Sequence, residues 1–208
     1  ACVPLAPLHN PANLTAIRAL AALVPDLPQY ASFDTAFHAT VPEVAARYAI
    51  PAEAEALGLR RYGFHGISYA SLVRKVQVMG SGSVPERVLA FHLGNGASAC
   101  GIVQGRSVAT TMGYSPLDGL TMGTRAGAMD GNAVLRLAEV HGVAGAARIL
   151  NRESGLLGLG GASDMRELAR AGTAEARFAS AHFCYWAVRH GGSLIAAMGG
   201  LDAVAFTG

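Results

Sequence analysis

Lysine is almost absent from this sequence, in which Lys75 is the single example and charged residues of all kinds make up only 14% of the chain. Globular chains usually contain ~25% charged residues. The net charge is only +2 and no run of basic residues occurs, so the sequence lacks the features of a nucleic-acid-binding protein. The hydrophobic content of 51% excludes intrinsic disorder for most of the 208 residues and allows a sizeable core.

Cysteine is also scarce. Cys2, Cys100 and Cys184 are odd in number and show no CxxC spacing, which argues against a disulfide framework or a zinc site. The seven histidines show no HExxH spacing and no clustering with cysteine. We therefore expect no transition-metal site, and we expect a cytoplasmic protein.

Long apolar runs are missing as well. The longest charge-free stretch, Val88–Gly105, contains His92, Asn95 and Gln104 together with several glycines, which a bilayer would reject. We expect neither a membrane span nor a signal peptide. The chain begins at Ala1 in the middle of a pattern, and we expect it to be truncated at both ends.

Glycine, in contrast, is abundant, with 26 residues, and indicates tight turns and close backbone approaches. Two glycines flank Asn95 between two apolar runs, which is a strong hairpin signal. We predict an antiparallel three-stranded meander with strands at 88–93, 97–103 and 107–111.

Apolar spacing and capping residues predict the remaining elements. In chain order they are a helix at 10–24, a strand at 30–33, helices at 68–79 and 132–140, a helix at 164–171 capped by Ser163, a helix at 174–198 and a buried strand at 202–206. A meander followed by helices and a strand indicates an α/β domain with a mixed sheet. We expect the last strand to join the sheet of the meander, and the helices at 132–140 and 174–198 to pack on that sheet.

Two glycine-containing segments have residue types that suit phosphate. The turn in His92–Gly96 exposes backbone amides that can cradle phosphate oxygens, although a plain hairpin turn has the same composition. Arg125 lies in Met122–Gly127, where its planar guanidinium suits phosphoryl oxygens. A solvated loop arginine is the alternative there.

The other candidate residues have equally open interpretations. His65 lies between glycines beside Phe64, and either residue can be purely structural. Asp34 follows the predicted strand at 30–33, where it is a catalytic carboxylate or a turn cap. His9 precedes a predicted helix start, and helix capping accounts for Ser163–Arg166.

The order of these segments is far more specific than any one of them. They are Leu5–Leu14, Phe33–His38, Arg60–Gly66, His92–Gly96, Met122–Gly127, Glu153–Gly158, Ser163–Arg166 and Phe206–Gly208. In this order they resemble the acetokinase family along essentially the whole chain. The resemblance implies an actin-like ATPase architecture of two ribonuclease H-like domains with a cleft between them. Residues 1–36 would end the first domain, and residues 37–208 would form most of the second, nucleotide-binding domain.

The resemblance also implies an activity, which is reversible transfer of the ATP γ-phosphoryl group to acetate with Mg²⁺. Three positions match the family's catalytic residues, namely Asp34, His65 and Arg125. The matching nucleotide-binding positions are His92, Leu93, Gly94, Asn95, Gly96, Asp164, Met165 and Arg166, and the acetate-binding positions are Phe64 and His9. An acetate carboxylate is already ionised at pH 7, so we expect Asp34 to orient Arg125 or a metal-bound water rather than to remove a proton.

Departures from the family pattern leave the acyl preference open. The usual His-Gly-Thr-Ser-His is His65-Gly-Ile-Ser-Tyr69 here, and the usual Gly-Asp followed by Asp-Pro is Gly127-Ala128 followed by Asp130-Gly131. The family's first phosphate loop and substrate arginine would precede Ala1. Its adenosine loop and the glutamate that positions Mg²⁺ would follow Gly208, so we expect no metal ligand in this chain and no activity from it alone.

Two alternatives to an acetate kinase remain open. One is a propionate or butyrate kinase, because a methylene in an apolar pocket changes binding by only ~1–3 kcal/mol. The other is a non-catalytic nucleotide-binding or dimerisation fragment, in which the aromatic helix at 174–198 forms a partner surface. The family resemblance implies a homodimer for the full-length protein.

Overall fold

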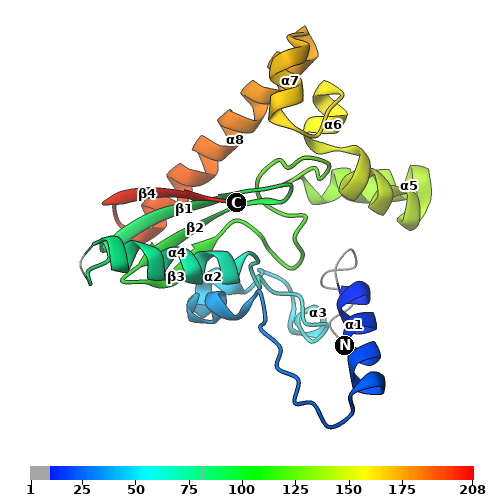
Figure 1. Ribbon diagram of the computed structural model, residues 1–208. Helices are drawn as coiled ribbons and strands as arrows, with labels where there is room; N and C mark the ends of the chain where they lie inside the picture. The colour runs from blue at the N-terminus through cyan, green and yellow to red at the C-terminus, as the bar shows by residue number, and fades with distance from the viewer. Residues whose placement is uncertain (1–9, 81) are drawn as a thin grey trace.

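A computed structural model describes residues 10–80 and 82–208 (Figure 1). Four strands form one mixed sheet in the order β3-β2-β1-β4. Strands β1 (Arg87–Leu93), β2 (Ala97–Val103) and β3 (Arg106–Thr110) pair antiparallel, whereas β4 (Ala203–Thr207) runs parallel to β1. The predicted meander, the mixed sheet and the α/β class are therefore confirmed.

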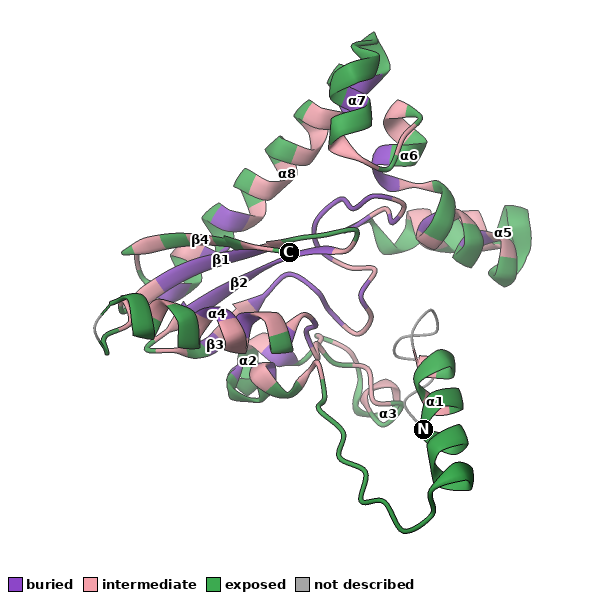
Figure 2. Cartoon of the chain, in the orientation of Figure 1, coloured by how far each residue is buried: buried purple, intermediate pink, exposed green. Residues whose placement is uncertain are grey.

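Two long helices lie on opposite faces of the sheet. Helix α8 (Ala174–Met198) packs its Leu194 and Met198 with Leu89 and Phe91 of β1. Helix α4 (Gly66–Met79) packs on the other face. The buried residues on the α4 side are Tyr69, Leu72, Val88, Ala90, Cys100 and Ile102. Because both faces of β1 and β2 are covered, these strands are apolar without clear alternation (Figure 2).

The remaining elements lie outside this sandwich. Before α4 come α1 (Asn10–Leu23), the 3₁₀ turn η2 (Ala36–Thr40), α2 (Glu43–Ala46) and α3 (Ala52–Glu55). Between β3 and α8 come α5 (Gly131–Arg148), the π-helical turn η3 (Ile149–Glu153), α6 (Gly155–Gly160) and α7 (Met165–Ala171). Figure 1 shows α1 apart from the sheet, at the end of an extended segment, and α1 buries none of its residues.

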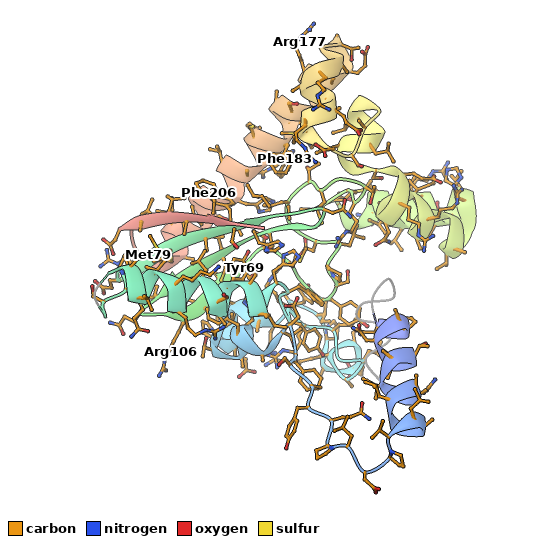
Figure 3. All side chains as sticks on the ribbon, in the orientation of Figure 1. Tyr69, Met79, Arg106, Arg177, Phe183 and Phe206 are labelled. Atoms are coloured by element: carbon orange, nitrogen blue, oxygen red, sulfur yellow. The ribbon has the colours of Figure 1, made fainter. Side chains whose placement is uncertain are left out.

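Two of the predicted strands need correction. Residues 30–33 form no strand, and within residues 10–80 and 82–208 no strand pairs with them, so Tyr30 and Phe33 are 94% and 66% exposed. The last strand does join the sheet, but as an edge strand rather than a buried one. Its Val204 and Phe206 are 46% and 69% exposed, and the Phe206 ring stacks on Phe91 at a centroid distance of 5.6 Å (Figure 3).

Two helix predictions need correction as well. Helix α5 is kinked at Gly142, where φ is 71° and ψ is 164°, so its first part agrees with the predicted helix at 132–140 and a second part continues to Arg148. It packs against η3 rather than on the sheet, and its N-cap is Asp130, which accepts from the Asn132 and Ala133 amides. Helix α7 is capped by Asp164 rather than by Ser163, because the Asp164 carboxylate accepts from the Arg166 amide.

Over the described residues, no helix has the length and apolar character needed to cross a membrane. Cys100 and Cys184, the two cysteines within that part of the chain, are both free thiols.

Candidate active site

The turn that leads into α4 places His65 in a left-handed conformation with φ 60° and ψ 21°. This conformation is uncommon for a residue with a side chain and costs about 1–3 kcal/mol. Asp34 offsets the cost, because its Oδ2 accepts from the His65 amide at 2.6 Å and its Oδ1 from the Ile67 amide at 3.2 Å. The Gly66 amide donates to the Asp34 carbonyl at 2.8 Å. Asp34 therefore holds the start of α4 and, contrary to our expectation, makes no hydrogen bond to Arg125 in this structure.

His38 fixes the same turn from the other side. Its Nε2 lies 2.9 Å from the Phe64 carbonyl and its Nδ1 lies 2.8 Å from the Ser107 hydroxyl. A carbonyl can only accept, so Nε2 carries the proton and Nδ1 accepts from Ser107. Burial lowers the pKa of His38 and keeps it neutral. The fit is so close that a Cβ on Gly63 would lie 2.5 Å from the His38 ring. The sequence analysis missed this residue, and its only signal there was membership of the Phe33–His38 segment.

Arg125 is a buried cation, with only 6% of its surface exposed. Its Nη1 donates to the Pro116 carbonyl at 2.6 Å, and no described carboxylate lies within 4.0 Å of its guanidinium. Burial lowers the pKa of Arg125, although a guanidinium stays charged in proteins. A buried charge without an opposite charge is costly, so this site favours an anionic ligand.

Gly96 marks the point where Arg125 and His65 meet. A Cβ at Gly96 would lie 2.7 Å from Arg125 Nη2 and 3.2 Å from His65 Nε2. The two side chains come from segments far apart in sequence and converge on this one point. Absence of a side chain at Gly96 is what allows both nitrogens to approach it.

His65 is neutral near pH 7. Burial is the main cause that lowers the pKa of His65 to about 4, and neighbouring His92 and Arg125 lower it further, while Asp34 raises it. The rings of His65 and His92 stack with centroids 3.9 Å apart. Arg125 therefore supplies the positive charge of this cluster, and His65 supplies a hydrogen-bonding group.

The turn between β1 and β2 borders the cluster. The amide of Gly123 donates to the Asn95 carbonyl at 3.3 Å, and a Cβ on Gly123 would lie 2.7 Å from Asn95 Oδ1. His92 Nδ1 lies 3.0 Å from the Ser68 hydroxyl. The Gly94 amide donates to the Gly96 carbonyl, so this amide is not available to a phosphate.

The Asp164–Arg166 segment meets the same loop. A Cβ on Gly123 would also lie 3.1 Å from the Ser163 carbonyl, which places Asp164 one residue from the Asn95 side of the cluster. The Arg166 side chain folds back onto Asp164, with its Nε 3.1 Å from each carboxylate oxygen, and this contact lowers the pKa of Asp164 to about 2. The pair is exposed, unlike the His65 turn.

The structure thus brings Asp34, His65, Asn95 and Arg125 together. The rest of the predicted nucleotide-binding set lies in the 92–96 turn, with Leu93 38% exposed, and at the start of α7. Phe64 lies in the core between the sheet and α8, and His9 lies outside the described residues. In the described ranges, no group of three or more His, Cys, Asp or Glu side chains is arranged to hold a metal ion.

Comparison with known proteins gives the family. A model of the acetokinase family matches residues 1–208. The chain belongs to the acetokinase family. This acetokinase chain is 50% identical to acetate kinase from Rhodopseudomonas palustris over 210 residues, covering 98% of the chain and 52% of that protein. It is 45% identical to acetate kinase from Bacteroides thetaiotaomicron, covering 100% of the chain and 54% of that protein.

Solved structures agree with this assignment. The acetokinase chain superposes on a propionate kinase from Francisella tularensis with a TM-score of 0.90 and 40% identity, covering 98% of the chain and 54% of that structure. It superposes on acetate kinase from Porphyromonas gingivalis with a TM-score of 0.87 and 39% identity, covering 98% and 53%. The chain therefore has the fold of the family's kinases and spans about half the length of the relatives it matches.

Proposed function

We propose that the protein carrying this chain transfers the γ-phosphoryl group of ATP to acetate, giving acetyl phosphate and ADP, and that the reaction is reversible. The observation that carries the proposal is the convergence of Arg125 Nη2 and His65 Nε2 beside Gly96. A buried guanidinium without a described carboxylate partner suits a phosphoryl group in transfer, whose charge is spread over three equatorial oxygens.

Each residue of the cluster has a distinct task in this proposal. Arg125 stabilises the charge on the equatorial oxygens, and neutral His65 adds a hydrogen bond without adding charge. Asp34 holds the backbone of His65 and removes no proton, because the acetate carboxylate is ionised at pH 7. These three roles support catalysis by positioning and by charge stabilisation rather than by proton transfer.

The nucleotide has two candidate contact segments. We propose that the 92–96 turn borders the phosphates and that Asp164, Met165 and Arg166 line the nucleotide side, since the two segments meet at Gly123. Acetate is assigned to the side of Phe64 and His9. Phe64 is 8% exposed and packs in the core, so only a small part of its surface is available to an apolar acetate pocket.

We propose that Mg²⁺ accompanies the nucleotide. Magnesium is usually held by one or two carboxylates together with substrate phosphates. The described residues offer no group of three ligands, and both Asp34 oxygens already accept from backbone amides. No step above depends on a bound ion.

A propionate or butyrate kinase is the second candidate, favoured by the close likeness to the propionate kinase structure. A methylene in an apolar pocket changes binding by only ~1–3 kcal/mol. Comparing kcat/KM for acetate, propionate and butyrate in the full-length protein decides between them. A higher kcat/KM for acetate supports the first proposal, and a higher value for either longer acid replaces it.

The setting of the chain in the whole protein is also proposed. Residues 1–36 are assigned to a preceding domain, in line with the lack of buried residues in α1, and residues 37–208 to the second domain. A homodimer is proposed because α8 exposes Phe178, Tyr185 and Val188. The cytoplasm is proposed as the compartment because both described cysteines are free. If the chain has no kinase activity in any form, its α8 surface makes a dimerisation fragment the alternative.

Trapping of acetyl phosphate as its hydroxamate, with ATP, Mg²⁺ and acetate, tests the activity. In the full-length protein we expect Arg125→Ala to lower kcat by about 10³-fold or more, with a much smaller change in the KM for ATP, because a charge-stabilising arginine acts mainly in the transition state. Arg106→Ala is the matched control, since Arg106 is exposed on β3. Near-normal kcat in Arg125→Ala would reject the role of this residue.

The same assay applies to residues 1–208 alone. We expect no turnover, because the chain spans about half of its relatives and loss of several positioning groups at once abolishes in-line transfer. Activity that disappears with Arg125→Ala would show that the catalytic set is already complete in these residues.

A further inference from the structure

The proposed role of His65 depends on which ring nitrogen carries its proton. A neutral imidazole has one N–H and one lone pair, so it stabilises an anion only if the nitrogen facing that anion is the protonated one. The tautomer is set by the partner of the other nitrogen. In this structure Nε2 lies beside Gly96 on the side of Arg125, and Nδ1 faces the buried Ser98 hydroxyl.

The hydroxyl groups of Ser98 and Tyr69 form a buried row of hydrogen-bonding groups that begins at His65 Nδ1. The Ser98 hydroxyl oxygen lies 2.9 Å from His65 Nδ1 and 2.5 Å from the hydroxyl oxygen of Tyr69. Ser98 comes from β2, and Tyr69 comes from α4 (Figure 3). Both are fully buried. The row therefore lies in the interior, where no solvent can supply or remove a hydrogen-bond partner.

Counting protons along the row gives its direction. Burial raises the pKa of Tyr69 far above its ordinary value, so its phenol keeps its proton. The Ser98 hydroxyl is the acceptor within reach of the Tyr69 proton. The proton of Ser98 is then directed at His65 Nδ1.

We propose that Tyr69 and Ser98 are positioning residues that hold His65 in the tautomer with its proton on Nε2, directed at the anion site beside Arg125. The inference deepens the proposed function and rests on it only for the identity of the anion. In the reverse direction, the buried Tyr69 proton would have no acceptor among the described residues, which is unfavourable. His65 would then present a lone pair to the anion and repel it.

The tautomer can be read directly from the nitrogen and proton NMR correlations of the histidine side chains in the full-length protein. At pH 7 we expect the His65 signals of a neutral ring with a protonated Nε2. Ser98→Ala removes the donor to Nδ1, and we expect a mixture of tautomers or a shift toward protonated Nδ1. Tyr69→Phe preserves the ring but frees Ser98 to change its direction, and we expect a smaller shift of the same kind.

Kinetics supplies a second readout. We expect Ser98→Ala to lower kcat by about tenfold, the effect of one ordinary hydrogen bond, and Tyr69→Phe to lower it less, with little change in the KM for ATP in either variant. Tyr48→Phe is the matched control, because its hydroxyl accepts from the Tyr114 amide away from the cluster. A loss of stability alone would move both the control and the test variants, whereas the tautomer signal moves only with the row.

The outcomes separate the two proposals. Wild-type protein with the proton on Nδ1, or variants that leave the His65 signals unchanged, would overturn the positioning role whatever the enzyme does. The expected tautomer in a protein without acetate kinase activity would instead support the positioning role and reject the proposed function.

Discussion

Two short segments lead into helices beside the same cluster, and they are built in opposite ways. The turn at His65 is buried and held by residues distant in the chain, with Asp34 31 positions and Ser98 33 positions away. The turn at Asp164 is exposed, and its carboxylate is satisfied by Arg166 two positions away. Long-range contacts fix the geometry of the first turn before any ligand binds, whereas the second turn is free to adjust. This difference suits a rigid site for the transferred group and an adaptable one for the nucleotide.

The largest effect is expected from substitution of Gly96, beside the turn at His65. A methyl group in Gly96→Ala would lie 2.7 Å from Arg125 Nη2, so the guanidinium must move. Misplacement by about 1 Å costs ~10²-fold in rate, and we expect a loss of kcat of this order. Gly192→Ala in α8 is the matched control, because a methyl group there would meet no described atom within 4 Å. Equal losses in the two variants would contradict the model of one shared anion site.

The next largest effect is expected from acid, which lowers the free energy of unfolding because His65 is buried in its neutral form. The pKa of folded His65 is about 4, below the ordinary value of 6.5, so the unfolded chain takes up the proton first as the pH falls. The free energy of unfolding therefore receives no penalty from His65 above pH 6.5, and it falls as the pH is lowered from 6.5 to about 4. At ~1.36 kcal/mol per pH unit this loss is on the order of 3 kcal/mol.

Urea unfolding at several pH values measures this effect. The variant His65→Asn should show a flatter dependence between pH 6.5 and 4, and the remaining slope then reports the other groups, such as His38, whose pKa is also lowered by burial. A His65 titration near pH 6.5 in the folded protein would contradict the burial argument.

Removal of the Asp34 carboxylate tests whether its hydrogen bonds to the His65 and Ile67 amides hold the turn before α4. In Asp34→Ala the amides of His65 and Ile67 both lose their acceptor, and we expect a loss of about 1–3 kcal/mol in the free energy of unfolding. Asp34→Asn keeps one acceptor oxygen and should lose less. Denaturant unfolding ranks the wild type, Asp34→Asn and Asp34→Ala by their free energy of unfolding. An alanine variant as stable as the wild type would show that Asp34 does not stabilise this turn.

The smallest effect is expected from substitution at the exposed turn of Asp164 and Arg166. Arg166 contacts only Asp164 among the described side chains, so Arg166→Ala should leave the unfolding temperature and kcat unchanged and raise the KM for ATP by a few-fold. A large loss of kcat would show that this turn shares the rigid role of the His65 turn and would remove the contrast between them.

Local patterns predicted most of the fold. The Asn95 turn and the apolar runs beside it predicted the meander, and Thr173 with Gly199 predicted the ends of α8, because caps and tight turns depend on adjacent residues. The predictions failed where the outcome depends on a distant neighbour. Residues 30–33 have strand-like composition without a partner strand, and β4 is exposed because it lies at the edge of the sheet.

The candidate site divides in the same way. Residue types and the family resemblance were enough to name Asp34, His65 and Arg125 as candidates. Only the tertiary structure decided that Asp34 clamps a backbone turn and that Tyr69 and Ser98 stand behind the His65 ring. The physical reason is that residue type determines which groups can donate, accept or carry charge. Which of them meet, and therefore which way a proton points and which charge stays unpaired, depends on contacts between segments that the chain keeps far apart until it folds.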